Sequence, residues 1–157
     1  MSAVIDSHHD DHHHGPAKGF SRWLYTTNHK DIGSMYLWFS LVMLFIGGAM
    51  AMVIRAELFE PGSQIVSPEF YNQMVTNHGL IMVFGVIMPA FVGFANWMIP
   101  MQIGAPDMAL PRLNNLSFWI LPVAFGILLS TFFMEGGAPN FGWTFYCLLY
   151  TSPSPRD

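Results

Sequence analysis

One histidine of this 157-residue chain lies within a long apolar stretch, which makes it the first candidate for chemistry. If a helix begins near Phe70, His78 lies about 12 Å along it, below the membrane surface. An ionisable side chain at that depth is costly and calls for a functional explanation. A neutral imidazole can bind iron or copper through one nitrogen while the other forms a hydrogen bond. The alternative is a packing residue whose imidazole bonds to a carbonyl of a neighbouring helix.

Oxygen-bearing residues cluster after the first apolar stretch, in a loop with a Pro-Gly turn. Glu57, Glu60, Gly62 and Gln64 lie within eight residues of one another. Two carboxylates, a backbone carbonyl and a side-chain amide are hard oxygen ligands that suit calcium or sodium. The alternative is a solvated acidic loop.

Two further charged residues lie at the edges of apolar stretches. Arg55 ends the first stretch, where a cation commonly extends its head to the membrane interface. Asp107 follows Pro106 in a loop, where an aspartate often caps a turn. Either residue also has a possible functional role, which depends on the motifs described below.

The helices that carry these residues are predicted from stretches of sequence without charged residues. Hydrophobic residues make up 52% of the chain and charged residues 10%. Three stretches, 35–54, 79–99 and 116–134, contain no Asp, Glu, Lys or Arg and have 20, 21 and 19 residues. As helices they would each be about 30 Å long, the thickness of the hydrocarbon core of a bilayer. We therefore predict an all-α membrane protein with three transmembrane helices at about 35–57, 70–99 and 116–134, which excludes an ordinary soluble enzyme.

Other bulk features narrow the function further. A net charge of −4 provides no basic surface for nucleic acid, and one cysteine, Cys147, excludes an internal disulfide and a multi-cysteine metal site. Residues 1–20 contain the histidine clusters His8-His9 and His12–His14 and are predicted to be a disordered tail, with weak metal binding as the alternative. These first residues do not read as a signal peptide, so insertion is expected to use the first span.

Membrane orientation is predicted from the basic residues. Lys18, Arg22 and Lys30 precede the first span and Arg112 lies in the second loop, whereas the first loop has only Arg55. Positive residues favour the cytoplasmic side, so the N-terminus and Asp107 are predicted there and the 57–64 loop on the outer side.

Features inside the spans indicate packing against further helices. Small residues at Gly47, Gly48, Ala49 and Ala51 favour close helix approach, and Pro89 and Pro122 are expected to kink the second and third spans. Three kinked helices make a thin bundle, so partner helices are expected.

Seven short motifs follow one another in a fixed order. They are residues 23–33 (WLYTTNHKDIG), 54–58 (IRAEL), 61–62 (PG), 78–82 (HGLIM), 96–97 (NW), 104–109 (GAPDMA) and 111–119 (PRLNNLSFW). In order and spacing they closely resemble subunit I of the haem-copper oxidases, from about residue 19 to residue 146. The resemblance is to the N-terminal quarter of a bacterial, haem a-type cytochrome c oxidase catalytic subunit, which implies a twelve-helix bundle.

The resemblance implies that several residues bind or contact the low-spin haem. It implies that His78 is an axial ligand of this haem a, with the second ligand on a much later helix. It implies that Arg55 bonds to the haem formyl group, where a fixed cation raises the reduction potential. Trp143 matches a tryptophan near the haem propionates, with a membrane-interface residue as the alternative.

The resemblance also implies a proton pathway and a structural cation. Asp107 matches the mouth of the pathway, and Asn96, Asn114 and Asn115 match residues that line its lower part. An exposed carboxylate collects protons, and neutral amides order water without trapping the proton as a charge. The 57–64 loop matches the site that binds calcium or sodium in bacterial relatives.

The implied parent protein transfers electrons from cytochrome c to oxygen and pumps protons outward across a bacterial inner membrane. Its partners would be membrane lipid, subunits II and III, cytochrome c and the remaining helices of subunit I. Its second haem and copper ligands are not in this sequence, so the chain alone is expected to be inactive. We divide the chain into the tail 1–20, the oxidase segment 21–146 and residues 147–157, which lack the family pattern and are predicted not to be native. A quinol oxidase, and a non-redox polytopic membrane protein, are the alternatives.

Overall fold

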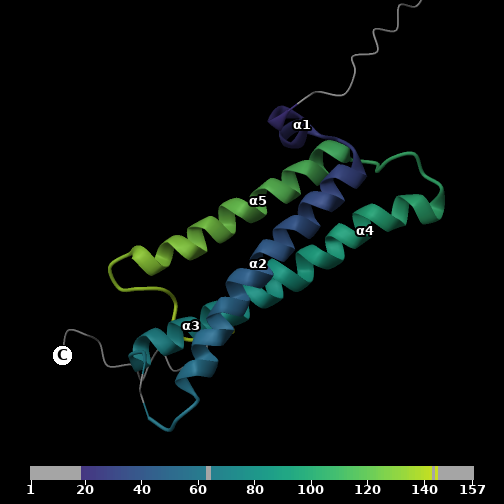
Figure 1. Cartoon of the computed structure of the whole chain (residues 1–157). Helices are drawn as coiled ribbons and strands as arrows, with labels where there is room; N and C mark the ends of the chain where they lie inside the picture. Colours follow the sequence, from purple (N-terminus) through teal and green to yellow (C-terminus); the bar gives the residue numbers. More distant parts are fainter. Residues whose placement is uncertain (1–18, 63–64, 143, 145–157) are drawn as a thin grey trace, which may run out of the picture.

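The structure, a computed structural model, describes residues 19–62, 65–142 and 144, and all regular structure in this part of the chain is helical (Figure 1). The helices are α1 (Phe20–Tyr25), α2 (His29–Glu57), α3 (Pro68–Leu80), the π-helix η1 (Ile81–Ile87), α4 (Met88–Ile103), α5 (Pro111–Ser130) and the 3₁₀ helix η2 (Thr131–Phe133). Three stretches are long and apolar enough to cross a membrane: His29–Glu57, Pro68–Ile103 and Pro111–Phe133. The prediction of an all-α protein with three spans is confirmed.

The helices begin earlier than the charge-free stretches. α2 begins at His29, where the side chain of Asn28 accepts a hydrogen bond from the Lys30 amide at 3.0 Å. α5 begins at Pro111, whose fixed φ angle and missing N–H suit the first turn of a helix. A charge-free stretch marks the part of a helix that fits the hydrocarbon core, whereas the helix itself continues into the interface.

The long helices run alongside one another, with α2 between α4 and α5 (Figure 1). α1, the start of α2 and the 104–110 loop lie at one end of the bundle, which we call the His29 end. Residues 58–62 and 65–67, the start of α3 and the described segment after α5 lie at the opposite end, which we call the Glu57 end. The two groups of candidate residues therefore lie at opposite ends.

The second span changes its helical form in the middle. Residues Ile81–Ile87 form a π-helix, in which the Met88 amide donates to the Val83 carbonyl. This segment ends just before Pro89, which has no amide proton to donate and whose ring crowds the preceding turn. π-helical turns are rare and occur frequently at functional sites, and this one begins three residues after His78.

Glycines set the distance between the first two spans. A Cβ atom at Gly33 would lie 2.9 Å from the Gly93 carbonyl oxygen, and one at Gly93 would lie 3.0 Å from the Gly33 oxygen. Gly47 is similarly close to Met82, whereas Gly48 faces open space. The predicted close approach of α2 to a neighbouring helix thus occurs at Gly47. The other glycine of α2 in close contact is Gly33, and not Gly48 as predicted.

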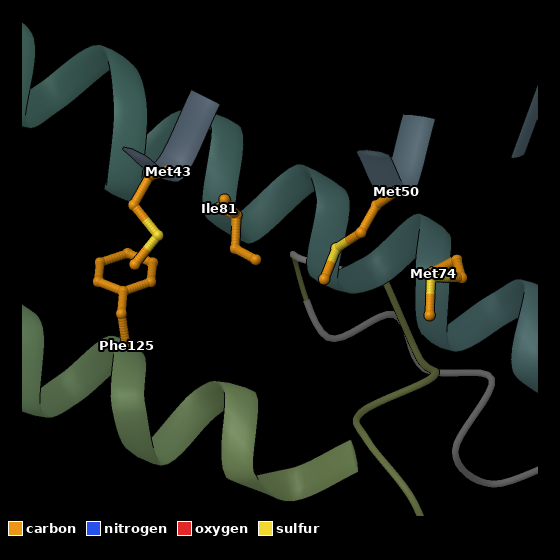
Figure 2. Packing of buried hydrophobic residues seen from close by; sticks show 5 residues of the cluster. All are labelled: Met43, Met50, Met74, Ile81 and Phe125. Atoms are coloured by element: carbon orange, nitrogen blue, oxygen red, sulfur yellow. The ribbon is translucent and has the colours of Figure 1, made fainter. Parts of the chain in front are cut away.

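Methionine and phenylalanine fill the space among the three spans. The buried cluster consists of Met43, Met50, Met74, Ile81 and Phe125 (Figure 2). Flexible thioethers fill the irregular gaps that a π-helix leaves. Only 22%, 22% and 11% of the most apolar parts of the three spans is buried, so much of their surface is left for lipid or further helices.

Candidate functional site

His78 lies in the last turn of α3, a helix that is capped at its N-terminus by Ser67. The Ser67 hydroxyl accepts a hydrogen bond from the Phe70 amide, and Pro68 occupies the first turn. His78 Nδ1 lies 2.9 Å from the carbonyl oxygen of Gly47 on α2. A carbonyl oxygen can only accept, so Nδ1 carries a proton, and in the neutral imidazole Nε2 then keeps its lone pair. The imidazole is therefore held in the tautomer that a metal ligand needs, and this same bond would also satisfy a packing histidine.

The surroundings of His78 restrict the kind of metal it can bind. Within the described residues, no three His, Cys, Asp or Glu side chains gather as a metal-binding group. One imidazole cannot build a closed site for a bare ion. It does fit an axial position on a haem iron, because the porphyrin itself supplies four ligands.

Arg55 lies at the Glu57 end, in the last turn of α2, and its side chain is exposed. It follows Gly47 by eight residues, which places it about 12 Å beyond the carbonyl that bonds to His78. Both residues therefore lie in the part of the first two spans that is nearer the Glu57 end. Trp143, the third residue assigned to the haem, lies outside the described residues.

Asp107 lies at the His29 end, in the loop after α4, which ends at Gly104 with a φ of 72°. Its Oδ1 atom accepts a hydrogen bond from the Met108 amide at 2.8 Å and lies 3.2 Å from His29 Nδ1. The side chain of Asp107 is 42% exposed and that of His29 is 8% exposed. The carboxylate therefore faces water on one side and a buried imidazole on the other.

The pairing of His29 with Asp107 could not be predicted from the sequence. The two residues are 78 positions apart, so no local spacing connects them. The only available signal was the position of His29 directly after the helix-capping Asn28, which brings it to the same bundle end as the 104–110 loop. Its Nε2 atom is buried and has no hydrogen-bond partner in the part of the chain that the structure describes.

Asp107 borders a cavity of about 640 Å³, whose lining also includes Asn96 and Asn114. Asn114 Nδ2 donates to Asn96 Oδ1 at 3.0 Å, so the two amides form one polar group across α4 and α5. Asn115 points elsewhere, because its amide donates to the Leu24 carbonyl of α1 at 2.8 Å. Three of the four residues assigned to the pathway therefore border one cavity, and the fourth tethers α1.

The acidic loop at the Glu57 end uses one carboxylate for its own structure. Glu57 is 5% exposed, and its Oε2 atom accepts hydrogen bonds from the Ile65 and Val66 amides at 2.9 and 3.0 Å. Glu57, Glu60 and Gly62 line one surface cavity of about 530 Å³. Gln64, the fourth residue assigned to the cation, lies outside the described residues.

The three apolar spans define a multi-pass helical membrane protein. A family model described as Cytochrome C and Quinol oxidase polypeptide I matches residues 31–153. The chain belongs to this family.

Relatives in this family are about half identical to the chain. Cytochrome c oxidase subunit 1 of Corynebacterium diphtheriae is 49% identical over 140 residues, which are 88% of this chain and 25% of the relative. The subunit of the same name from Corynebacterium glutamicum is 50% identical over 131 residues, or 82% of this chain and 22% of the relative. A heme-copper oxidase subunit I+III of Aeropyrum pernix is 47% identical over 128 residues, or 82% and 16%. The chain thus spans about a quarter or less of the length of these curated relatives.

Proposed function

We propose that this chain is part of subunit I of a bacterial cytochrome c oxidase. The complete subunit would pass electrons from cytochrome c through haem and copper to oxygen, form water and move protons outward. Family membership and the names of the relatives support the class of enzyme. The arrangement of the described residues supports the roles proposed for this part of the subunit.

The observation that carries the proposal is the hydrogen bond between His78 and Gly47, which keeps Nε2 ready to bind a metal. When bound there, a low-spin haem a would supply one-electron transfer. His78 would hold the haem from α3, and the hydrogen bond to Gly47 would orient the imidazole. Arg55 would place a positive charge near the haem edge, and Trp143 would lie near the propionates. A second protein ligand for the haem would come from another part of the subunit.

The proposed proton route begins at Asp107, which collects a proton from water at the His29 end. His29 holds the carboxylate from the buried side at 3.2 Å. Asn96 and Asn114 then offer neutral donors and acceptors along the cavity that Asp107 borders. These amides order water and cannot hold the proton as a stable charge, so the proton passes on.

The remaining assignments concern assembly. We propose that the N-terminus lies in the cytoplasm, which puts Asp107 on the side of proton uptake, and that subunits II and III, cytochrome c and lipid are partners. Glu57, Glu60, Gly62 and Gln64 would bind calcium or sodium on the outer side. This chain alone is proposed to be inactive, because its sequence lacks the ligands of the second haem and of copper.

The proposal is tested by oxygen consumption of the full-length subunit assembled with its partners in membranes. Reduced cytochrome c should support oxygen uptake, and a quinol should not. Uptake with quinol alone would assign the protein to the quinol oxidases that the family description also covers. No uptake with either donor, together with no haem in the purified protein, would favour a non-redox membrane protein.

A further inference from the structure

The chain after α5 folds back onto the helix that carries His78. We call residues 136–142 the return segment; Figure 1 shows it in yellow, running from the end of α5 to α3. It meets Gln73, Thr76 and Asn77, which are 7%, 2% and 0% exposed. Residues spaced by three and four share one face of a helix, so the return segment covers a single polar face of α3.

Two hydrogen bonds and one close contact fix the return segment to this face. The Gly142 amide donates to Thr76 Oγ1 at 3.1 Å, and Asn77 Nδ2 lies 3.4 Å from the Pro139 carbonyl. Gly137 has a φ of 73°, and a Cβ atom there would collide with the side-chain amide of Gln73. Only glycine allows both this backbone conformation and this approach.

The same polar residues also bond within α3. Thr76 Oγ1 donates to the Asn72 carbonyl at 2.9 Å, and Asn77 Nδ2 donates to the Gln73 carbonyl at 2.8 Å. The Asn77 Oδ1 atom is buried and has no hydrogen-bond partner among the described residues. A buried acceptor without a donor costs free energy, so a hydrophobic side chain would be the simpler choice if Asn77 served packing alone.

These contacts end one residue before His78. The ring of His78 is held from the other side by Gly47 on α2, at 2.9 Å. The turn that carries the imidazole is therefore fixed between α2 and the return segment. A shift of either contact would rotate or tilt the ring.

We propose that Thr76 and Asn77 are positioning residues that couple the return segment to the orientation of the His78 imidazole. This inference rests on the proposed role of His78 as a haem ligand. The return segment belongs to the Glu57 end, so the coupling links the outer loops of the subunit to the electron-transfer site.

The test uses Thr76→Val and Thr76→Ser in the full-length subunit in membranes. Val keeps the shape of Thr and removes the hydroxyl, whereas Ser keeps the hydroxyl. In Thr76→Val the Gly142 amide should exchange hydrogen about tenfold faster. The electron paramagnetic resonance signal of the oxidised low-spin haem should also shift, because it depends on the orientation of the imidazole plane. Thr76→Ser should resemble the unmodified protein in both measurements.

A second variant, Asn77→Leu, removes the contact with Pro139. It should also shift the electron paramagnetic resonance signal of the low-spin haem. The inference is overturned if amide exchange at Gly142 is unchanged in Thr76→Val, or if exchange increases while the haem signal stays the same. Failure of the proposed function would look different, because the low-spin signal would then persist when His78 itself is replaced by Ala.

Discussion

The two ends of the bundle differ in how much of each proposed site the chain contains. At the His29 end, residues from α2, α4, α5 and the 104–110 loop meet, and Asp107 Oδ1 accepts from the Met108 amide and lies 3.2 Å from His29. At the Glu57 end, His78 is fixed by Gly47, but one imidazole is half of a low-spin haem site. The proposed proton-uptake region therefore draws its residues largely from these three spans, whereas the proposed haem site would require residues from further helices.

This difference indicates how each end should respond to mutation. Residues that bond only to one another at one end of the bundle can be replaced without disturbing a cofactor at the other end. A haem ligand cannot be altered in this way, because it holds the cofactor itself. The variants below separate the two ends in this sense.

Asp107→Asn in the full-length oxidase should give the largest loss of turnover that leaves the haem unchanged. The amide cannot release a proton, so turnover and proton pumping should decrease by about a hundredfold, within the usual range for loss of a proton-transfer group. Oxygen consumption and proton release are measured together, with the haem absorbance as the control. Normal proton uptake would exclude Asp107 from the pathway.

Asn114→Leu and Asn115→Leu should have smaller effects at the same end, and they compare two neighbouring residues with different partners. Asn114 bonds to Asn96 beside the cavity, whereas Asn115 bonds to Leu24 of α1. Asn114→Leu should slow proton uptake by less than Asp107→Asn does, because it removes an amide that orders water and not the carboxylate that collects the proton. Asn115→Leu should leave uptake nearly unchanged and should increase proteolysis near α1. Equal loss of uptake in both variants would show that Asn115 also belongs to the pathway.

Glu57→Gln should have the smallest effect, and it acts at the opposite end. Loss of charge at an oxygen that accepts two backbone hydrogen bonds should reduce stability by about 2 kcal/mol. Thermal denaturation of the purified oxidase measures this decrease. The exposed Glu60→Gln is the matched control and should change stability only when calcium or sodium is present. If neither variant responds to these cations, the loop is not a cation site.

Much of the fold could be predicted from the sequence because the bilayer imposes it. Charge-free stretches of bilayer length specified three spans, and the structure extends them only at their ends, for example at Asn28 and Pro111. The contact of Gly33 with Gly93 could not be predicted, since it depends on how two helices cross. The π-helix after His78 was also missed, because no residue pattern in 81–87 requires it.

The candidate sites were predictable to different degrees. Asp107, Asn96 and Asn114 carried family motifs, and the structure brings them to one cavity. His29 was missed because its partner is far away in sequence, and Asn115 looks identical to Asn114 in sequence although its amide points to α1. A motif identifies residue types, but the direction of a side chain depends on the packing of the helices.

We propose that His78 binds the low-spin haem and that Asp107 serves proton uptake independently of this haem. The most direct test is the reduced-minus-oxidised absorbance of the low-spin haem in membranes that contain full-length His78→Ala or Asp107→Asn. Immunodetection should confirm that each subunit is present. We predict that the low-spin band is lost in His78→Ala and unchanged in Asp107→Asn. An unchanged band in His78→Ala would contradict the account.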